Sequence, residues 1–320
     1  PDEDDDDYDE YADPHQALPD NDPRVNQTTL FYKGLVANTS IQSLHLHTVG
    51  NIFSLLNPFF QQNQNLNELV IHDWQGYYNH WEDLISALRD CVSLKCVKIN
   101  HMELMGEESG EIFQTLRINQ PQLEVLEFPG NQLSRRSGEG EEALGNLLRD
   151  SNQLHTLDIS RNSLSDDALQ GGLLPYLGKL RCLNMSWNLL TITWEFDGWQ
   201  ALATLLKDPT CNLEELTLNG NQILGKRLRS FARALAKNKK LKILDLTNNV
   251  INAAGWDAFS DVLCDTSSIN NTYNSNHTLA EIHFQNEPRN GNLVREIYLE
   301  INVVCRQNRQ STNPAAVGRA

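Results

Sequence analysis

No apolar run in this 320-residue sequence approaches the roughly 18 residues that a membrane-spanning helix needs. The N-terminus also lacks a positively charged stretch followed by an apolar one, so we expect neither a signal peptide nor a membrane anchor. The first residue is Pro1 rather than Met, which leaves open whether the sequence is a fragment of a larger protein or a processed form. The absence of these segments predicts a soluble chain.

Basic residues are scarce. The sequence has 26 Lys and Arg against 42 Asp and Glu, a net charge of -16 and a pI near 4.9. Proteins that bind a phosphate backbone neutralise it with clustered cations. We therefore do not expect a nucleic acid as partner.

The acids are concentrated at the N-terminus, where residues 1–24 contain eleven acids and one Arg and carry a charge of -10. Such a segment cannot bury enough apolar surface to offset its ordering entropy, so we expect residues 1–25 to form an acidic disordered tail. Two roles stay open. The tail either keeps the chain soluble or docks Tyr8 and Tyr11, with the acids around them, onto a basic partner surface.

Cysteine pairs and catalytic motifs are also missing. The six cysteines are scattered without a Cys-x-x-Cys pair, at Cys91, Cys96, Cys182, Cys211, Cys264 and Cys305. This pattern fits neither a disulfide framework nor a zinc site and favours an intracellular location, cytoplasmic or nuclear. There is no nucleophile elbow and no Gly-x-x-x-x-Gly-Lys loop, so we expect no enzyme and no cofactor.

One short pattern, in contrast, recurs nine times. It consists of an apolar residue, two variable residues, an apolar residue, one variable residue, an apolar residue, two variable residues and often Asn, as in Leu241-Lys-Ile-Leu244-Asp-Leu246-Thr-Asn-Asn249. The copies begin at Ile41, Leu66, Leu94, Leu123, Leu154, Leu180, Leu213, Leu241 and Leu279. Their spacing of 25 to 38 residues leaves room for a strand, a turn and a helix in each unit.

The two halves of a unit have different periods. Leu244 and Leu246 alternate with Asp245, as in a strand with one buried face, whereas Leu228, Phe231 and Leu235 fall at helical spacing. No unit can bury both faces alone, so neighbouring units must stack, with parallel strands on one side and helices on the other. Helices are about 10 Å wide and parallel strands about 4.7 Å apart, so the stack must curve into a horseshoe.

The Asn that closes the short pattern has a structural interpretation. Its amide can satisfy backbone groups of its own and the adjacent turn that would otherwise be buried unpaired. We expect such a turn ladder at Asn131, Asn162, Asn188, Asn221 and Asn249. Val49, Trp74, Met102 and Glu287 replace this Asn, so the first three copies and the last are irregular, as at the ends of a solenoid.

These copies resemble leucine-rich repeats of the ribonuclease-inhibitor-like subtype over roughly residues 41 to 308. The expected fold is an α/β solenoid, a right-handed β-α superhelix with parallel strands on the concave face and helices on the convex face. We expect it to cover residues 26–308, followed by a C-terminal tail at 309–320, and to be a monomer. The resemblance implies that the concave face binds another protein and that the repeats are not catalytic.

Seven residues are our candidates for contact with a partner on the concave face: Glu127, Asp158, Arg161, Asn184, Trp187, Asn219 and Asp245. The acids favour a partner with a basic or mixed surface. For Trp187, partner contact and simple packing stay open, because Trp is enriched at binding hot spots but also common in cores. We expect Trp194 and Trp199 to pack in the structure, and the Asn-rich stretch 264–278 to be either a binding loop or a passive insertion.

The leading hypothesis is a non-enzymatic protein-binding scaffold or adaptor. The alternative is a regulator of a small GTPase, since the same repeat subtype occurs in activators of such enzymes, with Arg161 or Asn131 as the supplied residue. A third idea, a metal-dependent hydrolase, concerns His45, His47, His72, His101 and Asp73. These residues form no compact metal-binding motif, and we expect no metal.

Overall fold

The computed structural model describes residues 23–47, 52–72, 81–135, 138–190, 198–263 and 276–283, together with 301, 303 and 305. Its centre is one parallel sheet of nine strands in chain order: β1 Ser43–His47, β2 Glu68–His72, β3 Cys96–Asn100, β4 Val125–Glu127, β5 Thr156–Asp158, β6 Cys182–Asn184, β7 Glu215–Thr217, β8 Ile243–Asp245 and β9 Glu281–His283. Each of the nine predicted copies supplies one strand.

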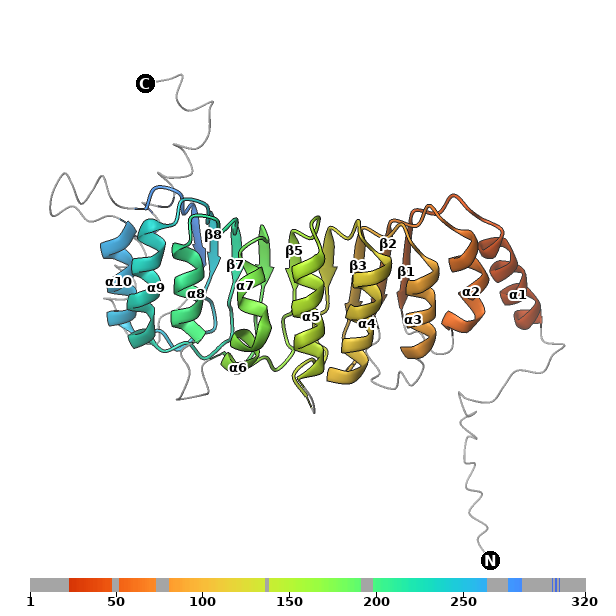
Figure 1. Cartoon of the computed structure of the whole chain (residues 1–320), viewed down its shortest axis with the longest axis horizontal. Coiled ribbons are helices and arrows are strands. Elements are labelled where there is room, and N and C mark those ends of the chain that lie inside the picture. The colour runs from red at the N-terminus through yellow and green to blue at the C-terminus, as the bar shows by residue number, and fades with distance from the viewer. Residues whose placement is uncertain are drawn as a thin grey trace, which may run out of the picture.

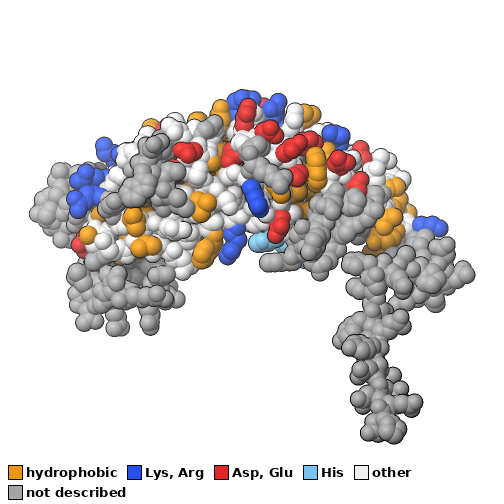
Figure 2. All heavy atoms as spheres, turned by 90° about the horizontal axis from the view of Figure 1, so that it is seen from below, with side chains coloured by type: hydrophobic (Ala, Val, Ile, Leu, Met, Phe, Trp, Pro, Cys, Tyr) orange, Lys and Arg blue, Asp and Glu red, His pale blue; other side chains and the backbone are white. Residues whose placement is uncertain are grey.

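Helices alternate with the strands and form a second layer (Figure 1). They are α1 Pro23–Val36, α2 Ile52–Gln62, α3 Trp81–Asp90, α4 Gly106–Asn119, α5 Glu139–Asp150, α6 Asp166–Ala168, the π-helical turn η1 Leu169–Leu173, α7 Leu174–Leu177, α8 Gly198–Lys207, α9 Gly225–Lys237 and α10 Ala253–Leu263. The molecule bends into an arch (Figure 2). The predicted α/β solenoid is therefore confirmed.

The core lies between the two layers and is built by the apolar positions of the repeat. In β4, Leu126 is fully buried, and Phe128 just beyond it contacts Phe113 of α4 with ring centroids 4.8 Å apart. Leu157 and Leu244 occupy the same position as Leu126 in β5 and β8 and are 1% and 0% exposed. Burying such a side chain contributes about 1.5–3 kcal/mol, so stacked leucines hold one repeat to the next.

The first three strands have five residues and the last six have three. In β5, β6 and β8 the third residue is the last of the strand, and its side chain accepts a hydrogen bond from the backbone N–H two positions later. These bonds are Ser160 N to Asp158 Oδ1 at 2.8 Å, Ser186 N to Asn184 Oδ1 at 3.0 Å and Thr247 N to Asp245 Oδ1 at 2.8 Å. The corresponding residues of β1, β2 and β3 are His45, Val70 and Lys98.

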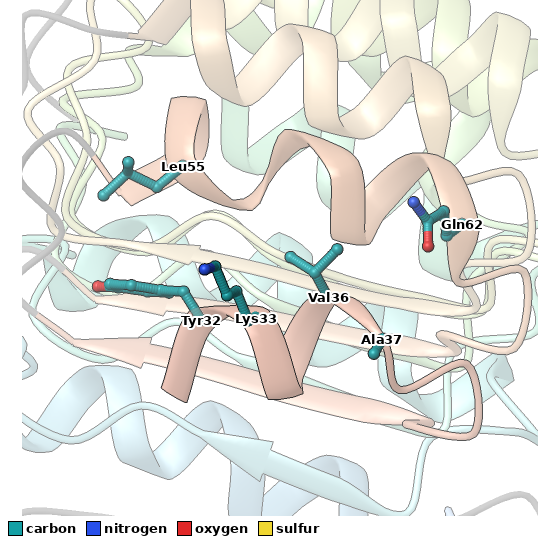
Figure 3. Close-up of a pocket in the computed structure, with 6 residues that line it drawn as sticks. All are labelled: Tyr32, Lys33, Val36, Ala37, Leu55 and Gln62. Atoms are coloured by element: carbon teal, nitrogen blue, oxygen red, sulfur yellow. The ribbon is translucent and has the colours of Figure 1, made fainter. Parts of the chain in front are cut away.

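The helix at the N-terminal end was not predicted. Helix α1 begins at Pro23, inside the segment for which we expected disorder up to residue 25. It packs Leu35 and Val36 against the core but leaves Leu30 and Phe31 68% and 66% exposed. Between α1 and α2 lies a groove lined by Tyr32, Lys33, Val36, Ala37, Leu55 and Gln62 (Figure 3). This end of the solenoid therefore presents apolar side chains to solvent.

Candidate functional site

The strand register aligns the outward positions of the repeats into one row on the face of the sheet opposite the helices. Each residue of the row pairs with the next across neighbouring strands: His45, Val70, Lys98, Glu127, Asp158, Asn184, Thr217, Asp245 and His283. With parallel strands about 4.7 Å apart, the row is about 38 Å long. Four of the seven predicted contact residues lie in it, and Asn219 lies two positions beyond Thr217.

A second row lies where the chain leaves each strand. The residue before the turn Asn has a left-handed backbone: φ is 69° at Gly130, 57° at Arg161, 54° at Trp187, 69° at Gly220 and 55° at Asn248. Left-handed φ is easy for Gly and costs other residues about 1 kcal/mol or more. The backbone N–H of Trp187 donates to the carbonyl of Asn219 at 2.7 Å, so the inter-repeat hydrogen bonds continue through this row.

Trp187 lies in the middle of this second row, between a cation and a glycine. The guanidinium carbon of Arg161, in the preceding repeat, is 5.1 Å from the centroid of the indole ring. A Cβ on Gly220, in the following repeat, would lie 2.6 Å from Cδ2 of Trp187, so the ring rests on that glycine. Trp187 remains 45% exposed. It is therefore held in place by its neighbours while much of its edge stays open to solvent.

The same arrangement occurs three repeats earlier. A Cβ on Gly130 would lie 2.1 Å from Nδ1 of His101, whose own φ is 57°. Burial and the nearby charge of Arg161 lower the pKa of His101. The sequence shows that this position holds a bulky residue in some repeats and Gly in others, but only the left-handed backbone and the contacts show that His101 and Trp187 cover the glycine of the next repeat.

The acids of the first row already have partners within the chain. Glu127 Oε1 accepts from Lys98 Nζ at 2.8 Å, and this hydrogen bond raises the pKa of Lys98. Asp158 Oδ2 accepts from Asn184 Nδ2 at 2.8 Å. Arg161 is different: it is exposed, and within the described residues its contact is the indole of Trp187 rather than a carboxylate. The face thus combines partly satisfied acids with one available guanidinium.

The turn asparagines connect consecutive repeats through their side chains. Nδ2 of Asn188 donates to the carbonyls of Ile159 and Met185, both at 3.0 Å, and its Oδ1 accepts from the backbone N–H of Asn162 at 2.9 Å and of Leu164 at 3.0 Å. Corresponding bonds are made by Asn131, Asn162, Asn221 and Asn249. Asn131 is only 3% exposed, so of the two residues considered for a GTPase only Arg161 is accessible.

Two histidines at the N-terminal end of the sheet, His47 and His72, stack on one another. The rings of His47 and His72 are 5.0 Å apart and nearly parallel, at 5°. Asn100 Nδ2 lies 3.2 Å from both ring nitrogens of His72. Within the described part of the chain, no three His, Cys, Asp or Glu side chains are arranged to hold a metal ion. Asp73 lies outside the described residues.

Other predicted features also fall outside the described residues. These are Trp194, the side chain of Trp199, and most of the Asn-rich stretch, of which residues 264–275 are not described. Residues 1–22 and the C-terminal tail likewise lie outside.

A comparison with protein-family models matches residues 212–234 to the leucine-rich repeat family. These residues are the seventh of nine copies that share one strand position, one helix layer and one register. The chain is a leucine-rich repeat protein. Leucine-rich repeat proteins generally mediate protein–protein interactions and are typically not enzymes.

Relatives and solved structures agree with this assignment. The chain is 28% identical over 233 residues to NLR family CARD domain-containing protein 4 of Rattus norvegicus and 26% identical over 231 residues to the Mus musculus protein. The matched part is 70% of this chain but 22% of each relative, so the chain spans about a fifth of their length.

The crystal structure of the leucine-rich repeat-containing protein LegL7 from Legionella pneumophila has the same fold. It superposes with a TM-score of 0.50 at 14% identity and covers 85% of this chain and 94% of that one. In the described part of this leucine-rich repeat protein, no helix has the length and apolar character needed to cross a bilayer.

Proposed function

We propose that this leucine-rich repeat protein is a non-enzymatic scaffold that binds a partner protein on its concave face, centred on Arg161 and Trp187. The observation that supports this most directly is the exposed indole held between Arg161 and Gly220. Trp and Arg are the residue types most enriched at binding hot spots. The full helix in most repeats fits the ribonuclease-inhibitor-like subtype, and the five cysteines of the described residues, all free, fit an intracellular location.

Pre-ordering of the Arg161 and Trp187 side chains is the physical advantage of this arrangement. Fixing a long exposed side chain on binding costs about 0.5–1.5 kcal/mol. The stack already restricts these two side chains in the free protein, so less conformational entropy is lost when the partner binds. The left-handed backbone directs both side chains along the row rather than into the core. A partner therefore meets a rigid aromatic edge next to an oriented guanidinium.

The charges around this centre favour a partner with a mixed surface. Asp158 and Asp245 lie on either side of Asn184 and Thr217 in the first row. Their carboxylates can accept hydrogen bonds from Lys or Arg side chains of the partner. Arg161 has no carboxylate within ion-pair distance among the described residues and can take an acidic side chain. The row length of about 38 Å suits an interface of standard size.

Affinity capture from native extract, followed by binding measurements on the purified partner, tests the proposal. We compare the intact chain with the double variant Arg161→Ala, Trp187→Ala, and with Ile118→Ala as a control, since Ile118 is 65% exposed on α4 of the convex side. The expected result is at least a tenfold weaker Kd for the double variant only. Equal affinity of all three chains for every captured protein would overturn the proposal.

A second candidate function, regulation of a small GTPase, depends on the exposure of Arg161. An arginine supplied to a GTPase stabilises the charge that develops on the transferred phosphoryl group. GTP hydrolysis by a panel of small GTPases, measured with the intact chain and with Arg161→Ala, decides this. Stimulation that disappears in the variant supports regulation, and no stimulation at any concentration rejects it.

A further inference from the structure

Helix α9 and the turn after it carry the densest positive charge of this acidic chain. Residues 225–242 contain eight Lys and Arg and no acid, whereas the remaining sequence has 18 cations against 42 acids. Lys and Arg side chains gather at the end of the arch formed by the last repeats (Figure 2). None of these residues contributes to the concave rows described above.

The cations of α9 lie along its solvent side. Arg229, Arg233 and Lys237 follow one another at intervals of four residues and are all exposed, while Leu228 and Phe231 are fully buried on the opposite side. Lys239 and Lys240 are exposed in the turn that follows. We call Arg229, Arg233, Lys237, Lys239 and Lys240 the basic stripe.

The basic stripe is not neutralised by any carboxylate of the described residues. Some cations near the stripe or on other helices are paired: Arg117 and Arg149 lie 3.3 and 2.9 Å from Asp150, and Lys242, just beyond the stripe, lies 2.8 Å from Glu214. Within the described residues, no carboxylate lies within ion-pair distance of any stripe residue. Like charges four residues apart on a helix cost about 0.2–0.5 kcal/mol per pair. An uncompensated local cost of this kind is typical of binding sites.

The sequence contains one segment with matching charge. Eight of the nine residues from Asp2 to Glu10 are acids, and the ninth is Tyr8. In an extended chain every second residue recurs at about 6.6 Å, close to the rise of about 6 Å between helix positions four apart. Alternate acids of this segment can therefore face successive cations of the stripe. The ring of Tyr8 can make a cation–π contact with one of the arginines.

The segment could touch the stripe of its own chain only by its outermost acids and only when fully extended. The 13 residue steps from Glu10 to the start of α1 at Pro23 span at most about 47 Å, and the 21 steps from Asp2 span at most about 76 Å. Helices α1 and α9 lie near opposite ends of the solenoid (Figure 1), seven helix-to-helix steps apart. At 8–10 Å for each step the distance is about 56–70 Å.

We propose that the acidic N-terminal segment of one copy binds the basic stripe on α9 of a second copy. The contact joins two different surfaces, so a bound pair keeps one unused segment on one copy and one unused stripe on the other, and association continues head to tail. It differs from the monomer that the repeat pattern led us to expect. Because it is electrostatic and exposed, it weakens steeply as salt rises. It leaves the concave face free and does not depend on the proposed function.

Sedimentation velocity of the full chain at low and high salt, with two variants, tests this contact. The segment variant is Asp4→Asn, Asp5→Asn, Asp6→Asn, Asp7→Asn, and the stripe variant is Arg229→Glu, Arg233→Glu, Lys237→Glu. We expect the intact chain to associate at low salt and each variant alone to associate at least tenfold more weakly. A mixture of the two variants should form one-to-one complexes, because it contains one intact segment and one intact stripe.

Two controls separate the contact from net charge and from misfolding. Lys33→Glu, Arg89→Glu, Lys207→Glu makes the same charge change at exposed cations of α1, α3 and α8 and should associate like the intact chain. Neutral substitution of Arg229, Arg233 and Lys237 by Gln, with unchanged circular dichroism, should reproduce the loss.

Three results would overturn the proposal. They are an intact chain that stays monomeric at low salt, equal weakening by the charge-matched control, and a mixture of variants that does not combine. If the stripe instead governs binding to vesicles containing phosphatidylserine while copies do not associate, the surface is a membrane contact and the proposal is wrong.

Discussion

The guanidinium carbon of Arg161 lies 5.1 Å from the centroid of the Trp187 ring, although the two residues belong to different repeats. Both have a left-handed backbone, which sends each side chain over the turn of the following repeat. A cation over an exposed indole contributes about 0.5–1 kcal/mol. The stack therefore couples repeats five, six and seven at the surface in addition to the leucines that couple them in the core.

The position of Trp187 should depend on the absence of a side chain at Gly220. In Gly220→Ala the new Cβ would lie 2.6 Å from Cδ2 of Trp187, at a φ of 69°. We expect the indole to be displaced and the free energy of unfolding to fall by about 1–3 kcal/mol. Incorporated 5-fluorotryptophan gives one 19F signal for each of the six tryptophans, and Trp187→Phe identifies the relevant one.

Gly138→Ala is the matched control for this experiment, because no atom lies within 4 Å of a Cβ at Gly138 and its φ is -79°. That variant should leave the Trp187 signal in place. An unmoved signal in Gly220→Ala would show that the indole does not rest on the glycine.

Removal of the side chain of one turn asparagine should destabilise the solenoid more than the small volume of that side chain suggests. Asn188 is 2% exposed, and Asn188→Ala leaves the carbonyls of Ile159 and Met185 and the N–H groups of Asn162 and Leu164 without this partner. Each buried group without a partner costs about 1–3 kcal/mol, partly recovered by relaxation and water. We expect urea unfolding to show a loss of about 3 kcal/mol.

The exposed Asn152 provides the comparison for the ladder. Asn152→Ala should change the free energy of unfolding by less than about 0.5 kcal/mol, as is usual for surface substitutions. Equal effects of the two variants would mean that the ladder contributes nothing beyond ordinary surface polarity.

Much of the fold could be predicted from the sequence because each repeat is local. The apolar spacing that begins at Leu154 or Leu241 determines which residues enter the core, and stacking then fixes the register, so the row from His45 to His283 followed directly. The first helix was missed because α1 precedes the first copy of the repeat and has a weak apolar pattern. A comparison of repeats gives no information about a segment, such as α1, that is not part of a repeat.

The candidate site was predicted only in part, for a different reason. The sequence identified Arg161 and Trp187 as candidates for partner contact, but not their stacking, because the contact depends on a left-handed φ in two turns separated by 26 positions. The pairing of Glu127 with Lys98 was missed in the same way, although the two residues were already adjacent in the predicted row. The sequence predicts which residue types lie at the site and how they align across the strands, but it does not predict the direction in which each side chain points.

The buried thiols should be unreactive in the folded chain. Burial raises the pKa of Cys91 to about 12 and that of Cys96 to about 11, so almost no thiolate is present at pH 8. We expect a thiolate-specific reagent to label Cys91 only after unfolding in urea, with the labelled peptide identified by mass spectrometry. Labelling of Cys91 in the native chain at the rate of a free thiol would contradict its burial.

The histidine stack should make the solenoid sensitive to mild acid. Burial and the neighbouring His47 and His101 lower the pKa of His72 below its ordinary value near 6.5. On acidification the unfolded chain therefore takes up this proton before the folded chain does. The free energy of unfolding is therefore not reduced by His72 above about pH 7. It decreases as the pH falls through 6.5 towards the pKa of His72 in the folded chain.

We therefore expect the urea midpoint of the intact chain to be lower at pH 5.5 than at pH 7.5, and this difference to shrink in His72→Asn. His277→Asn, which removes an exposed histidine outside the stack, should leave the difference unchanged. Burial also lowers the pKa of His101, so His101 should account for part of the midpoint difference that remains in His72→Asn. The double variant His72→Asn, His101→Asn should therefore have a smaller difference still. A midpoint that rises on acidification, or a difference as large in His72→Asn as in the intact chain, would show that protonation of His72 does not oppose folding.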